Sequence, residues 1–285
     1  MKSLWKYYIL FLTLINVVVW IAILNYPSKN LHMIACDVGQ GDAILVVYAK
    51  TQILIDGGPD ASVVDCLSKY LPFWDRQLEA VIMTHAEIDH YGGLIDVFER
   101  YKVQSFIKSP LDSGSQEYKV LKDLVGGKGI RVVEVRKGMK VRLGLMHLDI
   151  LSPAKEEITV STGTEFNKYS VVTILSYKNF SALLTGDIPP EISDELAGEF
   201  RNLNQQPVDY LKVPHHGSKN GLSKSLLDEV SPVVAVISVG KDNSYGHPHE
   251  ETIKLLDDKD IKILRTDEIG DVEIVSDGKK VWLDN

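Results

Sequence analysis

THAEIDHYGG, residues 84–93, places four side chains that can bind metal ions within six positions: His85, Glu87, Asp89 and His90. The apolar run before it, residues 79–83, predicts a strand, and the spacing of residues 94–101 predicts a helix. Imidazole and carboxylate groups on such a strand-to-helix loop suit zinc, manganese or iron. Because alternate residues of an extended loop point to one side, this loop can serve two metal ions. The alternative is a polar helix N-terminus with two incidental histidines.

Further polar clusters follow apolar runs elsewhere, each where a strand is expected to end. They comprise Asp37, Gln40, Asp42, Asp56, Asp187, His215, His216, Asn243, Tyr245, His247 and His249. Because the ends of neighbouring strands meet at one rim of a sheet, we expect these side chains to come together. Six of the 8 histidines lie in the opening stretch and two of these clusters, whereas His32 and His147 lie in strand patterns and need no function.

The composition indicates one large or two small folded domains and excludes a disordered chain, with 285 residues, 45% hydrophobic and 25% charged. The formal net charge is -8, and because the first 30 residues carry three lysines and no acid, the rest carries -11. A domain this acidic is not a general binder of polyanions, although bound divalent cations change the field locally.

The chain has two cysteines, Cys36 and Cys66. Two are too few for a disulfide framework or a cysteine-based zinc site. Both lie in apolar segments, which favours buried free thiols, and a single bridge between them is the alternative.

Residues 7–26, YYILFLTLINVVVWIAILNY, contain no charge. As a helix they would cover about 30 Å, the thickness of a hydrocarbon core, with aromatic residues near both ends. Lys2 and Lys6 precede them and favour a cytoplasmic N-terminus. We therefore expect a single-pass membrane anchor and linker over residues 1–30 and an extracytoplasmic domain over residues 31–285. A cleavable signal peptide is the alternative, although no typical cleavage site follows.

The remainder reads as one domain without a long linker or a repeat. Hairpin patterns precede strand–helix alternation, and this order then occurs a second time. Helices are expected over residues 63–71, 115–125, 189–203, 222–230 and 249–256. Two such halves pack sheet against sheet with helices outside, in an α/β (α+β) sandwich.

Residues 100–142 contain 11 basic and 4 acidic residues, a local excess of positive charge in an acidic domain. Such a run is either a solvated face or a strip that follows a phosphate backbone. No ladder of aromatic residues accompanies it, so recognition by base stacking is not indicated.

The chain resembles the metallo-β-lactamase superfamily, and within it the hydrolase domain of ComEC-type DNA-uptake proteins. The resemblance rests on seven ordered motifs: DVGQGDA (37–43), LIDGG (54–58), THxExDHxGG (84–93), NxxSVV (167–172), LLTGD (183–187), KVPHHGS (212–218) and YGHPH (245–249). It extends from about Ile34 to about His249. It implies an αββα sandwich with two divalent metal ions, Zn²⁺ or Mn²⁺, at its rim.

The resemblance also implies which side chains bind the two ions. The implied ligands are His85 and Glu87 for the first ion, Asp89, His90 and His215 for the second, and Asp187 between them. Many relatives place a further histidine where this chain has Asn167 and Ser170, and we assign these two residues to the substrate. Relatives also have Asp or His in place of Glu87. The oxygen-rich ligand set favours manganese without excluding zinc.

Two metal ions can clamp the attacking and leaving oxygens of a phosphodiester, and a water between them loses its proton near neutral pH. We expect Asp89 or Asp187 to orient that water. His247 is expected to donate a proton or a hydrogen bond to the phosphoryl oxygen or leaving group. Asn243 and Tyr245 are expected to position the substrate group that His247 contacts.

Two residues beside the implied ligand His215 have other expected roles. Ser218 either donates to a phosphate or closes a local turn. His216 is expected to support a ligand rather than to bind metal. No GxSxG elbow, phosphate-binding loop or dinucleotide-binding motif is present in the sequence.

The expected function is that of a membrane-anchored, extracytoplasmic metal-dependent hydrolase, a phosphodiesterase or nuclease that acts on nucleic acid. ComEC-type proteins join this domain to a channel, so we expect a separate channel or uptake partner. Two alternatives remain: hydrolysis of a small or envelope-linked ester, phosphoester or β-lactam, and a non-catalytic module stabilised by metal.

Overall fold

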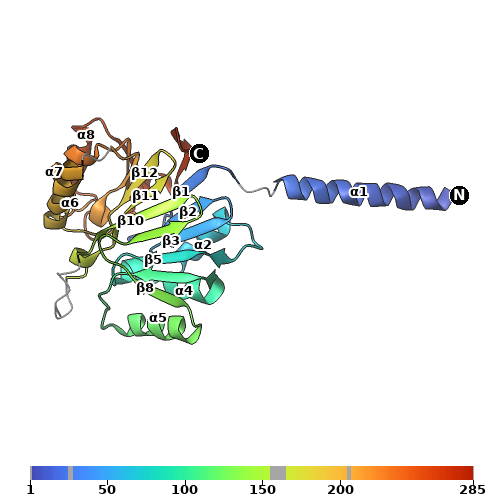
Figure 1. Ribbon diagram of the computed structural model, residues 1–285, viewed down its shortest axis with the longest axis horizontal. Helices are drawn as coiled ribbons and strands as arrows, with labels where there is room; N and C mark the ends of the chain where they lie inside the picture. The colour runs from blue at the N-terminus through green and yellow to red at the C-terminus, as the bar shows by residue number, and fades with distance from the viewer. Residues whose placement is uncertain (1, 25–27, 155–164, 204–206, 285) are drawn as a thin grey trace.

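The computed structural model describes residues 2–24, 28–154, 165–203 and 207–284. Two β-sheets pack face to face, and helices cover the outer face of each sheet (Figure 1). This arrangement is the αββα sandwich expected from the sequence.

The two sheets are built in a simple spatial order. The first sheet runs β17 (Val281–Asp284), β16 (Val272–Ser276), β1 (Leu31–Ala35), β2 (Ile44–Tyr48), β3 (Thr51–Ile55), β5 (Ala80–Met83), β7 (Ser105–Lys108), β8 (Arg131–Glu134). The second runs β15 (Lys262–Arg265), β14 (Val234–Ile237), β13 (Tyr210–Lys212), β12 (Phe180–Leu184), β11 (Val172–Tyr177), β10 (Met146–Ser152), β9 (Lys140–Leu143). A short pair joins β4 (Gln77–Leu78) to β6 (Lys102–Val103).

Helices bury their apolar faces against each sheet. The first sheet is covered by α2 (Ser62–Tyr70), α4 (Leu94–Arg100) and α5 (Gln116–Gly127). The second is covered by α6 (Pro190–Leu203), α7 (Lys224–Val230) and α8 (Glu250–Asp257). Shorter helical turns are α3 (Ile88–Tyr91), α9 (Thr266–Ile269), η1 (Asn167–Tyr169) and η2 (Pro214–Gly217). All six helices expected within residues 31–285 are confirmed, each to within two residues at either end.

Alternation along the strands produces the core. In β1, Leu31, Met33 and Ala35 face the second sheet. Ile34 and the following Cys36 face the helices, and all five side chains are buried. Because successive side chains of a strand point to opposite faces, one strand contributes to both apolar layers. Burial of one such large side chain is worth about 1.5–3 kcal/mol.

Strand direction decides where the polar loops meet. β1, β3 and β5 run the same way, because β2 is antiparallel to β1 and β3, and β5 is parallel to β3. In the second sheet β12, β13 and β14 are parallel. The two sets of strand ends share one rim, where the amide of Val171 donates to the carbonyl of Thr84 at 2.9 Å.

The N-terminal helix α1 spans Lys2–Leu24 and stands apart from the sandwich (Figure 1). Within the described ranges, no helix is long and apolar enough to span a membrane, so the transmembrane helix expected over residues 7–26 is not supported. The expectation relied on all 20 residues to match a hydrocarbon core of about 30 Å. The last two of them lie outside the described residues.

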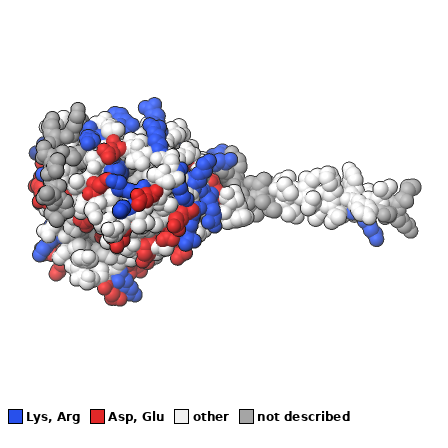
Figure 2. All heavy atoms as spheres, turned by 90° about the horizontal axis from the view of Figure 1, so that it is seen from below, with Lys and Arg blue, Asp and Glu red and all other residues white. Residues whose placement is uncertain are grey.

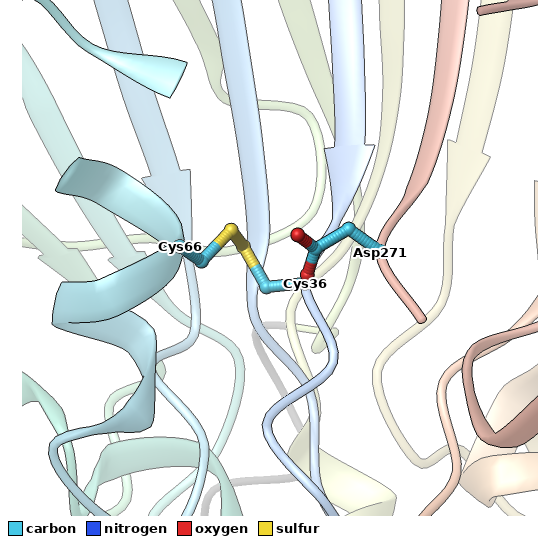
Figure 3. Close-up of side chains that lie close together, drawn as sticks. All are labelled: Cys36, Cys66 and Asp271. Atoms are coloured by element: carbon cyan, nitrogen blue, oxygen red, sulfur yellow. A yellow bond between two sulfur atoms is a disulfide. The ribbon is translucent and has the colours of Figure 1, made fainter. Parts of the chain in front are cut away.

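The two cysteines form a disulfide bond. Cys36 follows β1 and Cys66 lies in α2, and their Cα atoms are 5.9 Å apart (Figure 3). The prediction of free thiols is therefore wrong, because a separation of 30 residues along the chain conceals how close the two lie in space. The bond ties the start of the loop that carries Asp42 to α2.

Candidate metal centre

Three imidazoles converge at the rim from separate strand ends. His85 and His90 come from the loop and α3 that follow β5, and His216 comes from η2 after β13. Asp187, after β12, lies among them, and all four side chains are buried. The Nε2 atoms of the three histidines have no hydrogen-bond partner among the described residues. Buried nitrogens left in this way fit a metal site.

In His85 and His90, the other ring nitrogen, Nδ1, donates a hydrogen bond to a neighbouring side chain. The hydroxyl of Thr84 donates to Asp56 Oδ2 at 2.7 Å, so its oxygen accepts from His85 Nδ1 at 3.0 Å. His90 Nδ1 donates to Asp56 Oδ2 at 2.9 Å. With the proton on Nδ1, each Nε2 lone pair is free to bind metal.

His216 faces Asp187, whereas the predicted ligand His215 does not. His216 Nδ1 donates to the carbonyl of Ser238 at 2.9 Å, and its Nε2 lies 3.2 Å from Asp187 Oδ2. Both histidines have φ near +50°, a left-handed backbone that directs consecutive side chains apart. His215 is half-buried and lines the neighbouring cleft. The structure thus places His216, rather than the predicted ligand His215, beside Asp187.

The distances around Asp187 fit a four-coordinate ion. Its Oδ2 atom lies 3.3 Å from His90 Nε2 and 3.2 Å from His216 Nε2. His216 Nε2 lies 3.4 Å from Asp89 Oδ2. Ligand atoms about 2.0–2.1 Å from a tetrahedral centre are separated by about 3.3–3.4 Å. The four residues therefore fit one divalent ion as they stand.

The other half of the centre is more open. His85 Nε2 lies 3.9 Å from Glu87 Oε2, and the side chain of Glu87 is 38% exposed. The ligand atoms of His85, His90 and Asp187 lie within 4.8 Å of one another, so Asp187 belongs to both halves. An ion held in this half would have few protein ligands, so water or substrate could complete its coordination, as in catalytic metal sites.

Asn167 begins η1, and Ser170 follows it directly, ahead of β11. Ser170 is buried, and its Oγ accepts from the amide of Asp187 at 3.2 Å. Ser170 therefore holds the backbone from which the side chain of Asp187 projects. The side-chain oxygen of Asn167 is buried without a hydrogen-bond partner among the residues described, which leaves an acceptor available.

A buried lysine contacts two carboxylates of the centre. Lys212 Nζ lies 2.5 Å from Asp42 Oδ2 and 3.3 Å from Asp187 Oδ1, and it donates to the carbonyl of Gly186 at 3.0 Å. Asp187 thus uses Oδ1 for the lysine and keeps Oδ2 for metal. The sequence analysis gave Lys212 no role. The available signal was a lysine inside the apolar strand YLKV, where a charge must be paired.

Burial and neighbouring charges shift the pKa values of the centre. Burial raises the pKa of Asp187, but the adjacent His216 and His90 outweigh it and hold the pKa well below its usual range. Burial lowers the pKa of His85 to about 3, so this imidazole is neutral at neutral pH. Burial raises the pKa of Glu87 to about 6, and the neighbouring carboxylates add to the effect. Such a crowd of carboxylates is relieved by bound cations.

A cleft of about 850 Å³ opens beside the metal centre. Its walls include Glu87, Asp89, Asp187, His215, Tyr245 and His247. Among the described lining residues there is no Lys or Arg. A negatively charged substrate would therefore depend on bound metal for electrostatic attraction.

The loop that carries His247 is built around Asn243. Asn243 Oδ1 accepts from the amide of His247 at 3.0 Å, and its Nδ2 donates to the carbonyl of His247 at 2.7 Å. The ring of Tyr245 is 66% exposed and lies 5.7 Å from that of His247. Burial lowers the pKa of His247 to about 4. A neutral imidazole at this position donates a hydrogen bond more readily than a proton.

Ser218 and the basic run have local explanations in the structure. Ser218 Oγ accepts from the amide of Asn220 at 3.2 Å, which matches the turn role. Five cations of residues 100–142 form ion pairs: Arg100, Lys108, Lys122, Lys137 and Lys140. None of the run's cations lines the cleft in the described structure, which favours the solvated face over a strip that leads to the metal centre.

Known proteins resemble this chain over most of its length. Residues 36–241 match the family described as the metallo-beta-lactamase superfamily. ComE operon protein 3 of Bacillus subtilis is 30% identical over 261 residues, which are 83% of this chain and 32% of that protein. Recombination protein 2 of Haemophilus influenzae is 30% identical over 226 residues, which are 77% of this chain and 26% of that protein. The chain thus spans about a third or less of the length of these two relatives.

A solved structure shares the fold. The metallo-beta-lactamase fold protein YhfI from Bacillus subtilis superposes with a TM-score of 0.56 and covers 89% of this chain and 100% of its own. The two sequences are 10% identical, so the likeness concerns the fold alone.

Proposed function

The chain belongs to the metallo-β-lactamase superfamily, and from this premise we propose that it is a metal-dependent phosphodiesterase that cleaves DNA. The observation that carries the proposal is the set of three buried imidazole nitrogens that surround Asp187 without hydrogen-bond partners in the described structure. Two divalent ions, when bound, stabilise the attacking and leaving oxygens of a phosphodiester and activate water near neutral pH.

The contacts suggest how the chain holds these ions. Asp89, His90 and His216 would share one ion with Asp187 Oδ2, because their ligand atoms are separated by tetrahedral distances. His85 and Glu87 would hold the other. We therefore replace His215 by His216 in the ligand set that the family resemblance implied. Either metal, zinc or manganese, suits this mixture of nitrogen and oxygen ligands.

The remaining side chains of the cleft act on the substrate. His247 is neutral at neutral pH, so we assign it a hydrogen bond to a phosphoryl oxygen rather than a proton transfer. His215, whose ring lies 5.7 Å from that of His247, adds a second imidazole on the same wall. Tyr245 offers an exposed ring on which a base can stack. Asn243 holds the loop that presents His247 and Tyr245.

The proposal of DNA as substrate is supported by the name of one relative, Recombination protein 2, because recombination acts on DNA. One observation favours a second candidate. The described walls of the cleft carry carboxylates and no Lys or Arg, which suits a substrate with a single phosphodiester. A small or envelope-linked phosphoester is therefore the second candidate function.

We also propose that the domain works outside the cytoplasm. The Cys36–Cys66 disulfide supports this location, because such bonds persist in oxidising compartments and are rare in the cytosol. Mass spectrometry of the protein from its native membrane fraction, with and without reductant, tests whether the bond is present there. Two free thiols in that fraction would contradict the location.

The activity is tested with a labelled DNA oligonucleotide and bis-p-nitrophenyl phosphate, each with manganese or zinc. We expect Asp187→Asn to reduce turnover of both by more than about 100-fold, beyond the effect typical of residues that only support a ligand. His147→Ala, at an exposed position of β10, is the matched control and should retain full turnover.

The outcomes separate the candidates. Cleavage of the oligonucleotide that Asp187→Asn abolishes supports the proposal. Cleavage of the small ester alone favours the second candidate. Absence of turnover in the fully metal-loaded protein contradicts both and favours a binding module stabilised by metal.

A further inference from the structure

The end of the sandwich opposite the metal centre is where the chain passes from α1 into the first sheet. β1, β3 and β5 all run toward the rim, so their first residues lie at this opposite end. The hydroxyl of Tyr177 donates to the carbonyl of Lys29 at 3.2 Å, and its ring lies 4.8 Å from that of Tyr48. These contacts gather the turns after β2 and β11 around residues 28–31.

Basic side chains collect at this end, which we name the linker face. It comprises Lys29, Lys50, Arg76, Lys102, Lys178, Lys279 and Lys280. Lys178 Nζ donates to the carbonyl of Asp277 at 3.0 Å and so joins two hairpin turns. The amide of Lys102 donates to the carbonyl of Arg76 at 2.8 Å. Figure 2 shows Lys and Arg side chains beside the point where α1 meets the sandwich.

No cation of the linker face forms an ion pair with a described residue, although the carboxylate of Asp277 lies near Lys178 and Lys279. All seven cations are exposed, and none lies within 4.0 Å of a carboxylate of any described residue. Lys69 and Arg100, by contrast, form ion pairs, with Asp271 and Asp96 respectively. This concentration of free positive charge stands in a domain whose net charge is -11.

Two aromatic side chains project from the same end. Phe73 and Trp74 are 80% and 54% exposed, and their ring centroids lie 4.7 Å apart. Their loop also carries Arg76 and leads to Glu79, whose amide donates to the carbonyl of Gln52 at the start of β3. An exposed aromatic pair beside basic side chains is typical of a surface that meets lipid headgroups.

The helix α1 joins the domain at the linker face. Its large apolar side chains between Leu4 and Trp20 are exposed. An apolar helix, an aromatic pair and seven free cations therefore lie on one side of the molecule. The metal centre and its cleft lie on the other.

We propose that the linker face docks on a lipid surface that carries anionic headgroups. Lysine and arginine attract such headgroups, and aromatic side chains enter the headgroup layer. Nucleic acid is the other polyanion that seven cations could attract, but a strand bound here would lie at the far end from Asp187. Docking in this way directs the cleft away from the lipid. The inference does not rest on the proposed hydrolysis.

The test uses Trp74 as its own reporter in the full chain. Trp5, Trp20 and Trp282 are replaced by Phe, which leaves Trp74 as the only tryptophan. Vesicles of phosphatidylcholine with and without phosphatidylglycerol are added, and protein binding is followed separately by co-flotation. We expect the emission of Trp74 to shift to the blue on anionic vesicles and to be quenched by brominated lipid.

A charge-matched pair of variants locates the contact. Lys50→Glu with Lys279→Glu and Lys280→Glu should weaken the Trp74 response by about tenfold or more, since each lysine near an anionic surface contributes about fivefold. The control variant also carries three substitutions of lysine by glutamate, Lys119→Glu, Lys241→Glu and Lys254→Glu. These lysines are exposed and lie outside the linker face. Circular dichroism confirms that both variants fold.

Three results would overturn the inference. The first is a Trp74 emission that stays unchanged while the chain floats with anionic vesicles. The second is an equal response of the two triple variants. The third is an oligonucleotide that shifts Trp74 emission with the same lysine dependence while anionic vesicles do not.

Discussion

At the scale of single residues, each imidazole of the metal centre owes its orientation to the group at its Nδ1 atom. Asp56 is the shared support, because it accepts from the amide and hydroxyl of Thr84 and from His90. Asp56 itself has no contact with the cleft. Asp56 therefore holds the Nε2 atoms of His85 and His90 toward Asp187.

Asp56→Asn tests that support. The amide can no longer accept all of these hydrogen bonds, so we expect metal affinity to fall by about 10–100-fold while the fold persists. Competition with a chromogenic chelator measures the affinity, and circular dichroism checks the fold. An affinity equal to that of the unmodified protein would show that Asp56 does not orient the ligands.

Proton displacement predicts the pH dependence of metal binding. Burial lowers the pKa of His90, but Asp187 and Asp56 outweigh it and raise that pKa well above the usual value. Burial likewise lowers the pKa of His216, and Asp187 and Asp42 raise it well above the usual value. These protons must leave before metal binds, so affinity should rise with pH through the region of the raised pKa values, by up to about tenfold per pH unit for each proton. Isothermal titration in buffers of different ionisation enthalpy counts the protons, and a count of zero would contradict the prediction.

Lys212 predicts a large effect on stability. Lys212→Met removes the lysine from the buried carboxylates of Asp42 and Asp187 and leaves them only their histidine neighbours, which should cost about 3–5 kcal/mol of the free energy of unfolding in the metal-free protein. Lys224→Met, which breaks an exposed pair with Asp228, is the control and should leave the free energy of unfolding nearly unchanged. Urea unfolding measures both, and equal losses would refute the role of Lys212.

At the scale of elements, residues 84–93 form the strand-to-helix connection that their sequence predicted. It follows β5, turns through α3 and leads into α4. Its two glycines permit close packing, since a Cβ at Gly93 would lie 2.1 Å from the carbonyl oxygen of Asp60, and one at Gly92 would lie 2.0 Å from that of Pro59. The motif was therefore sufficient to predict both the loop and its position on the rim.

The disulfide connects two elements of the first layer. It closes a loop of 30 residues between the end of β1 and α2, beside the carboxylate of Asp271, which accepts from the amide of Asp37 and from Lys69. Loop closure of this length stabilises by about 3.5 kcal/mol through the unfolded chain. We expect the double variant Cys36→Ala, Cys66→Ala to lose about that much in urea unfolding.

Reduction supplies the matched control for this prediction. Dithiothreitol should lower the stability of the unmodified protein by a similar amount and leave the double variant unchanged. A double variant as stable as the oxidised protein would contradict the structural role of the bond.

At the scale of the whole molecule, periodicity and motif order predicted the sandwich, its helices and the rim. The strand ends of both sheets share one rim, which is why Asp187 and His85 meet although they lie far apart in sequence. A linear pattern does not contain the backbone angles or the crossings of distant elements. The φ angles near +50° turn His216 rather than His215 toward Asp187, and the crossing of β1 past α2 brings Cys36 to Cys66, which the sequence did not predict.

The sequence also does not predict which distant charges pair. It shows Lys212 only as a charge in an apolar strand, and its partner Asp42 lies 170 positions away. The free cations of the linker face come from six separate turns and loops, so no single run of the sequence displays them. In the basic run over residues 100–142, which the sequence does display, five of the 11 cations form ion pairs.

The central claim is that Asp187 and three imidazoles, with His216 among them, hold two metal ions. Diffraction from manganese-loaded crystals at the manganese absorption edge measures this directly, with His216→Ala and His215→Ala as the compared variants. We predict two anomalous peaks beside Asp187 in the unmodified protein, and both should remain in His215→Ala. In His216→Ala, the peak that lies between Asp89 and Asp187 should be lost. Two peaks that persist in His216→Ala, or no peak within about 3 Å of Asp187, would contradict it.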